Sequence, residues 1–315
     1  RGNKLNKKLK RIVKDIIFNQ DISNLLDDYR KNGSITINSP YKDLVQFQID
    51  ECVKENSDIL TEGYQVGEPW NGDIENAPIL FLSSNPAYKF YEISPHYDII
   101  KSLIKKAGII IKNTDSFIEF ISTRIQKSPS HDENDSVLRV PVWKGKSDVP
   151  YWSCVRERTE YLLPNDLKLQ WNKKFSRREY VREIMKYAVC MEIVPFKSNN
   201  EIGVTDDVLK DCWKKFTKEI LELSGASIFV LVGKNTTLKT FKEQNKLPQS
   251  DIEALKSGGS IDIKIGNRNR TIVYNGDFNQ GKTAYLQNCL QQATIQKLKD
   301  TIERRILFDI ITQNF

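Results

Sequence analysis

The chain has 315 residues, of which 39% are hydrophobic and 28% are charged, so it can bury one large core or two smaller ones. No run approaches the roughly 18 apolar residues of a transmembrane helix, and the basic N-terminal segment lacks the apolar core of a signal peptide. These features exclude an obvious membrane protein. We expect a globular, cytoplasmic protein without a membrane partner.

Charge and cysteine usage narrow the possible partners. Lysine and arginine number 48 against 41 acidic residues, a net charge of +7. This modest excess favours a polyanion such as DNA but does not establish it, because basic runs such as Arg156 to Arg158 are typical of solvated helix faces. The five cysteines form no Cys-x-x-Cys pair, which argues against disulfide, zinc and iron–sulfur frameworks. We expect reduced thiols, no metal, no cofactor and no obligate protein partner.

Residues 1–65 are predicted to form an N-terminal helical accessory layer. Apolar residues recur at helical spacing in its first segment, Asp21 or Ser23 is a suitable cap for a second helix, and residues 44–53 favour a third. The first helix is basic and suits a phosphate backbone. A cap packed on the main domain is the simpler interpretation.

The segment from Ala77 to Tyr91 contains the most informative motif. Residues 79–82 form an unbroken apolar run, typical of a strand buried on both faces of a parallel sheet, and the polar turn Ser83-Ser84-Asn85-Pro86 ends it. Ligands in open α/β sheets lie beyond the carboxyl ends of such strands. Asn85 is therefore a candidate site residue, with a generic strand exit as the alternative.

Two features follow this motif. His96 is one of only two histidines; it suits a phosphate contact or a proton carrier, and equally a helix cap or surface residue. Residues 113–166 are polar and irregular in pattern, which predicts a long loop with aromatic islands. Trp143, Tyr151 and Trp152 in those islands suit either stacking on a base or pinning the loop to the core.

A second buried strand is predicted at residues 188–194, after a helix over residues 175–187 that Ser176 caps. Glu192 interrupts this apolar strand. Because an ionised carboxylate is costly inside an apolar strand, Glu192 should find a partner or face a pocket at the sheet edge. A salt-bridged or surface glutamate is the alternative.

The remaining pattern completes the predicted fold. A helix over residues 206–223 precedes an apolar strand at 227–233, and a hairpin closed at Gly266-Asn267 precedes the last strand. This order predicts a three-layer α/β/α sandwich around a short, mainly parallel four-stranded sheet, with the N-terminal helical extension. We place the α/β domain at residues 66–290 and a C-terminal helix packed on it at residues 291–315.

The exit of the last strand matches the P-loop pattern. Gly276, Gly281, Lys282 and Thr283 fit Gly-x-x-x-x-Gly-Lys-Thr, which binds nucleotide phosphates in many NTPases. Such enzymes need later strands to supply a magnesium-binding acid, whereas the rest of this chain has a helical pattern. An NTPase that uses residues 276–283 is therefore a secondary alternative.

Three motifs in order over roughly residues 66 to 290 resemble the uracil-DNA glycosylase superfamily, nearest to its mismatch-specific and single-strand-selective branches. The resemblance implies that Asn85 positions the attacking water. Ser83 departs from the usual glycine of that motif. Glu192 falls where the single-strand-selective branch has an asparagine that binds the base, and Asn275 stands where a histidine usually supports the leaving base.

The resemblance also implies the other contacts. Ser84, Tyr88 and Phe90 would line or stack on the base, whereas Gly276, Lys282 and His96 would face the DNA. Because a glutamate carboxyl suits the N4 amine and N3 of cytosine, we expect a monofunctional DNA glycosylase that excises a flipped, modified cytosine-type base in repair or anti-phage defence. A catalytically silent nucleic-acid-binding module of the same fold is the main alternative.

Overall fold

A computed structural model describes residues 5–54, 67, 69–84, 118, 122, 150–196, 198, 200–233, 235–278 and 285–313. The chain divides into two compact units, each assembled from three segments. The first comprises Arg1–Trp70, Ser84–Ile125 and Glu192–Ile220, and the second comprises Asn71–Ser83, Gln126–Met191 and Leu221–Phe315. The domain boundaries after residues 65 and 290 stay predictions.

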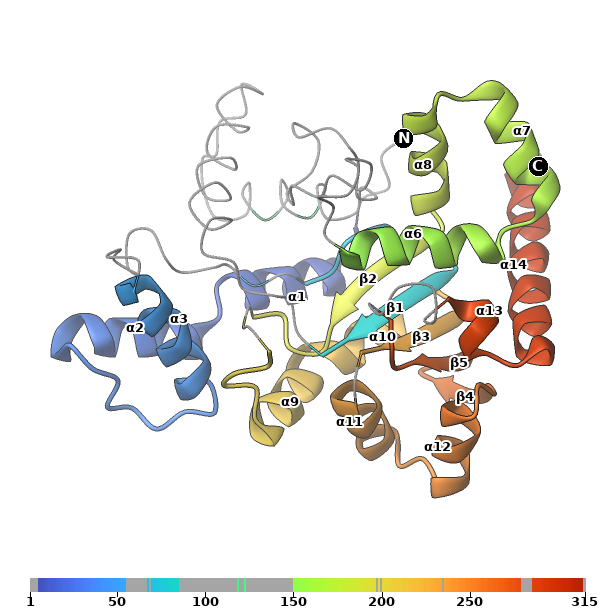
Figure 1. The fold of residues 1–315 in the computed structure, drawn as a ribbon. Helices are drawn as coiled ribbons and strands as arrows, with labels where there is room; N and C mark the ends of the chain where they lie inside the picture. Colours follow the sequence, from blue (N-terminus) through green and yellow to red (C-terminus); the bar gives the residue numbers. More distant parts are fainter. Residues whose placement is uncertain are drawn as a thin grey trace. The chain divides into compact units, whose positions relative to one another are not determined.

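The sheet has five strands in the order β2-β1-β3-β5-β4 (Figure 1). Their bounds are β1 Ile79–Ser83, β2 Ala188–Glu192, β3 Ile228–Val232, β4 Ile261–Ile265 and β5 Arg268–Asn275. β3 pairs in parallel with β1 and with β5. β4 pairs antiparallel with β5, and the turn between them places Gly266 at φ 59°, which glycine adopts at little cost.

β2 runs parallel to β1. Near its start the Ile79 amide donates to the Tyr187 carbonyl (3.1 Å), and past its end the Val194 amide donates to the Ser84 carbonyl (2.8 Å). The residue numbers of the hydrogen-bonded partners increase in the same direction along both strands, as they do in a parallel pair. The sheet is therefore mainly parallel, as predicted, but it has five strands in the described part of the chain instead of the predicted four. The hairpin partner β4 adds an antiparallel edge strand.

Helices cover both faces of the sheet in the second unit, which gives the predicted three layers (Figure 1). One face carries α6 (Pro150–Leu162), α7 (Asn165–Lys174), α8 (Arg177–Met185), α13 (Leu286–Cys289) and α14 (Gln292–Gln313); α11 (Asn235–Asn245) and α12 (Gln249–Lys256) pack on the other. α6 falls inside the region predicted to be irregular, so that prediction is wrong for residues 150–162.

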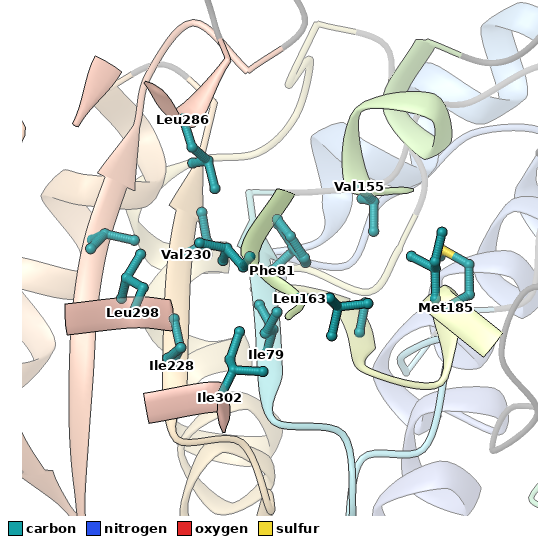
Figure 2. Packing of buried hydrophobic residues seen from close by; sticks show 14 of the residues in the cluster. Ile79, Phe81, Val155, Leu163, Met185, Ile228, Val230, Leu286, Leu298 and Ile302 are labelled. Carbon is teal, nitrogen blue, oxygen red and sulfur yellow. The ribbon is translucent and has the colours of Figure 1, made fainter. Parts of the chain in front are cut away.

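The core of the second unit follows from strand alternation, since successive side chains point to opposite faces. Ile79 and Phe81 of β1, together with Ile228 and Val230 of β3, face the layer that contains α6 and α14 (Figure 2). Every residue of β3 is buried, as expected for a parallel strand covered on both faces. From the helices, Val155, Met185, Leu286, Leu298 and Ile302 complete this cluster.

The first unit is helical. It contains α1 (Lys7–Ile17), α2 (Gln20–Asn32), α3 (Lys42–Lys54), α9 (Asp206–Cys212), the π-helical turn η3 (Trp213–Thr217) and the start of α10 (Lys218–Leu223). The predicted N-terminal helices are therefore present. The predicted cap is wrong: Asn19, rather than Asp21 or Ser23, caps α2 by accepting from the Ile22 amide at 3.0 Å.

A polar network joins the N-terminal segments to the π-helical turn. The Tyr41 hydroxyl donates to Asp211 at 2.6 Å, and the Lys215 ammonium contacts Asp211 at 2.7 Å and Asp21 at 2.8 Å. Burial raises the pKa of the nearby Cys212 thiol to about 12. The structure describes all five cysteines, and none of them is in a disulfide.

At the amino ends of the strands, the segment before β1 lies against the segment before β3. The Gly225 amide donates to the Ile74 carbonyl at 2.8 Å. A Cβ atom at residue 225 would lie 1.9 Å from the Glu75 carbonyl oxygen. Only glycine fits there without moving the backbone. Separately, no helix in the described part of the chain has the length and apolarity that a membrane span requires.

Candidate functional site

The carboxyl ends of β1, β3 and β5 lie at one edge of the sheet in the second unit. Leu82 is in register with Leu231, and Val232 is in register with Asn275. β1 ends at Ser83, while Gly233 takes the chain out of β3 with φ 90°. This edge is where open α/β sheets bind ligands.

Five predicted site residues lie outside the described residues. They are Asn85, Tyr88, Phe90, His96 and Lys282. Their roles stay predictions from the sequence. Trp143 also lies outside the described residues.

Ser84 and Glu192 belong to the first unit, and the structure brings their backbones together. The Ser84 carbonyl accepts from the Val194 amide, two residues beyond Glu192. Both residues are half-buried, and Glu192 is the last residue of β2. A half-buried carboxyl at a strand end avoids much of the desolvation cost of an enclosed charge. Glu192 thus interrupts the apolar pattern where the strand stops.

Asn275 and Gly276 form the exit of β5 in the second unit. Asn275 is only 1% exposed, whereas Gly276 is half-buried. A Cβ atom at residue 276 would lie 2.5 Å from the Tyr274 hydroxyl oxygen, so glycine lets that phenol lie against the turn. Burial raises the pKa of Tyr274. Tyr274 is a polar group of this exit that the sequence analysis missed; its only signal was an aromatic residue directly before Asn-Gly.

Phe278 anchors the same exit in the core. Its ring is 1% exposed and lies 5.7 Å from Phe81 of β1 and 5.4 Å from Tyr151 of α6. Tyr151 was expected either to stack on a base or to pin a loop to the core. The structure supports the second interpretation, because the Tyr151 ring contacts the core residue Phe278. The next residue, Trp152, lies within α6.

Arg158 of α6 holds Phe278 from a buried position. Its side chain is 1% exposed, and its guanidinium donates to the Phe278 carbonyl at 2.9 Å and to the Cys154 carbonyl at 3.2 Å. The same group lies 4.5 Å from the Phe278 ring centre and 5.7 Å from that of Tyr285. The interpretation of Arg156 to Arg158 as a solvated basic face is therefore wrong for Arg158.

The structure also bears on the P-loop alternative. P-loops wrap a phosphate with main-chain amides and open a helix at Lys-Thr. Here Phe278, within the variable part of the pattern, is buried in the core and its carbonyl accepts from Arg158. Gly281, Lys282 and Thr283 lie outside the described residues. The NTPase alternative therefore stays a prediction.

A hollow lies in the second unit, on residues of α6, α7 and the α13 region. It has a volume of about 380 Å³ and is lined by Glu157, Arg158, Glu160, Tyr161, Lys168, Tyr285, Leu286 and Gln287. Burial lowers the pKa of Lys168. None of the predicted site residues that the structure describes is among those lining residues. Among the described residues, no three His, Cys, Asp or Glu side chains gather in a metal-binding group.

No protein-family model fits the chain, and no curated protein matches it.

Proposed function

We propose that the protein is a monofunctional DNA glycosylase that hydrolyses the N-glycosidic bond of a flipped-out, modified cytosine-type base. One observation carries the proposal. The three motifs lie at the carboxyl ends of parallel strands: Ser83 ends β1, Glu192 ends β2 and Asn275 ends β5. Open α/β sheets use these ends for ligands.

The proposed chemistry needs a positioned water and a stabilised leaving group. The water oxygen bonds to C1′ as the C1′–N bond breaks, and the electron pair leaves with the base, which then takes up a proton. Asn85 would hold the water. Unstacking the nucleotide costs a few kcal/mol, which contacts of the base with Ser84, Tyr88 and Phe90 would offset.

Asn275 would donate a neutral hydrogen bond to the departing base in place of a histidine. Its side chain is buried, so the hydrogen bond would form away from bulk water. A donor shielded from water stabilises developing charge more strongly than an exposed one.

Glu192 would select the base. A carboxylate accepts from the N4 amine of cytosine and, when protonated, donates to a ring nitrogen, but it repels the O4 acceptor of uracil. Its half-buried place at the end of β2 supports this role. Preference for a modified cytosine suits either repair or defence against phages that modify their DNA.

The DNA backbone would be held by charge. Lys282 and His96 supply cationic or polar groups, Gly276 allows close approach of a phosphate, and the net charge of +7 favours a polyanion. No metal or cofactor takes part in the proposed reaction.

Mass spectrometry of bases released from a panel of modified and damaged DNAs tests the proposal directly. We expect release of a modified cytosine from at least one substrate and none from unmodified DNA. DNA binding without release from any substrate would instead support the silent binding module. Magnesium-dependent ATP or GTP hydrolysis by the purified wild type would support the NTPase.

A further inference from the structure

Arg158 contacts both residues that border positions 279–284 of the chain. Phe278 precedes these positions and Tyr285 follows them, and both rings lie within 6 Å of the guanidinium carbon, at 4.5 and 5.7 Å. The hydrogen bond to the Phe278 carbonyl fixes the backbone as well as the ring. One buried side chain therefore contacts the chain directly before and directly after positions 279–284.

Phe278 is separated from Asn275 by only two residues, so the restraint on Phe278 also limits where Asn275 can lie. Phe278 is held by Arg158, by Phe81 and by Tyr151, while Asn275 is held by its pairing with Val232. The turn between Asn275 and Phe278 is thus fixed at both ends. Misplacement of a catalytic group by about 1 Å costs on the order of a hundredfold in rate. A shift of Phe278 that displaces Asn275 should therefore lower the rate of base release.

Arginine has properties for this task that lysine lacks. Its planar group donates in two directions and stacks on aromatic faces at the same time, whereas an ammonium is a strongly hydrated point charge. Arg158 uses both properties, because it bonds two carbonyls and lies over two rings.

We propose that Arg158 is a positioning residue for the proposed base release: it holds the Asn275–Phe278 turn in its working geometry and does not itself contact the DNA. This inference rests on the proposed function. It assigns to a buried arginine of α6 a role that the sequence motifs do not include.

The test compares Arg158→Lys with a matched control, Arg270→Lys. Arg270 is also buried, bonds two carbonyls and lies 5.4 Å from the Phe229 ring centre, but at the opposite ends of the strands. We expect Arg158→Lys to lower the single-turnover rate of base release about tenfold or more, with DNA affinity changed less than about threefold. Arg270→Lys should lower the melting temperature and leave the rate per folded molecule unchanged.

Hydrogen exchange gives a readout that does not depend on activity. Arg158→Lys should raise exchange at residues 276–278 and 285–286 but not across β5, and Arg270→Lys should leave exchange at those residues as in the wild type. Equal exchange and equal rates in the two variants would overturn the positioning role. If the wild type releases no base while the exchange difference is present, the proposed function fails and the anchoring of the turn stands.

A second variant keeps the test informative if Arg158→Lys does not fold. Tyr285→Leu removes one ring contact and leaves the hydrogen bond to Phe278, so it should raise exchange near residue 285 and lower the rate by a smaller factor. Wild-type exchange and rate in Tyr285→Leu would contradict the proposal.

Discussion

The two ends of the sheet in the second unit use the same device for different purposes. At the amino ends, Arg270 donates to the carbonyls of Ser224 and Ala226, which lead into β3, and burial lowers its pKa to about 10. At the carboxyl ends, Arg158 donates to the carbonyl of Phe278, where the chain leaves β5. The two arginines thus make similar contacts, but Arg270 holds a structural turn and Arg158 holds a turn of the candidate site. The different roles that we assign to them follow from their places along the strands, because their hydrogen-bonding chemistry is the same.

The largest effect is expected for a substitution beyond the carboxyl end of β1, where we place the catalytic group. Asn85→Ala should lower base release on the order of a hundredfold or more, because the attacking water loses its holder, while DNA binding stays nearly intact. Asn269→Ala is the control, since Asn269 is an exposed asparagine near the start of β5. Single-turnover assays with matched oligonucleotides measure both. Unchanged release in Asn85→Ala would remove the catalytic assignment.

The next effect concerns base preference. Glu192→Gln keeps the size of the side chain but loses its charge, so activity on the cytosine-type base should fall by a factor that corresponds to about 1 to 3 kcal/mol, with a trace gained on uracil. Glu222→Gln, at another half-buried glutamate, should change neither. Efficient wild-type excision of uracil, unaffected by Glu192→Gln, would show that Glu192 does not read the base.

A smaller effect is expected for phosphate binding. Lys282→Ala should weaken DNA binding and reduce the slope of log affinity against log salt by about 1, since one phosphate contact is lost. Lys264→Ala removes an exposed lysine of β4 and should leave that slope unchanged. Fluorescence anisotropy over a salt series measures both variants. Equal slopes would place Lys282 away from the DNA.

The smallest effect is expected for the stability contribution of Asp262 in the hairpin formed by β4 and β5. Burial opposes ionisation of Asp262, but hydrogen bonds from Lys297 (2.7 Å) and Thr271 (2.8 Å) hold its pKa below the ordinary value. A lowered pKa stabilises the fold above about pH 4 and loses that contribution as the pH falls further.

Asp262→Asn should therefore cost no more than about 1 kcal/mol at neutral pH, because the pair is partly exposed. The difference in unfolding free energy from the wild type should vanish in acid, and base release should not change. Denaturant melts at neutral and acid pH measure this. A difference that persists in acid would mean that the carboxylate's charge is not the cause.

Local patterns predicted most of the fold. Buried parallel strands are continuous apolar runs, so β1, β2 and β3 were found near their observed bounds. Ser176 caps α8 as predicted: its hydroxyl accepts from the Glu179 amide and its own amide donates to the Glu179 carboxylate. These elements depend on neighbours within a few residues, which a sequence displays directly.

The misses depend on contacts between distant residues. The polar, irregular pattern of residues 113–166 predicts a loop where α6 forms, whereas Tyr151 at the start of α6 packs on Phe278 far along the chain. The burial of Arg158 depends on Phe278 and Tyr285. No local pattern distinguishes an arginine that will be enclosed from one that will be solvated. In the candidate site, the ends of the strands could be predicted from the sequence. The contact of Arg158 with Phe278 could not.

Gly225 has a consequence for recognising relatives of this chain. Because a side chain at that position would overlap the Glu75 carbonyl, substitutions at residue 225 should be accepted more rarely than substitutions in the candidate site motifs. A homologue diverged in substrate would still need glycine just ahead of its third strand. A sequence search could use the pattern of a long helix, a small residue followed by glycine, and an apolar strand. Such a search should retrieve distant relatives of this chain that searches with the site motifs miss.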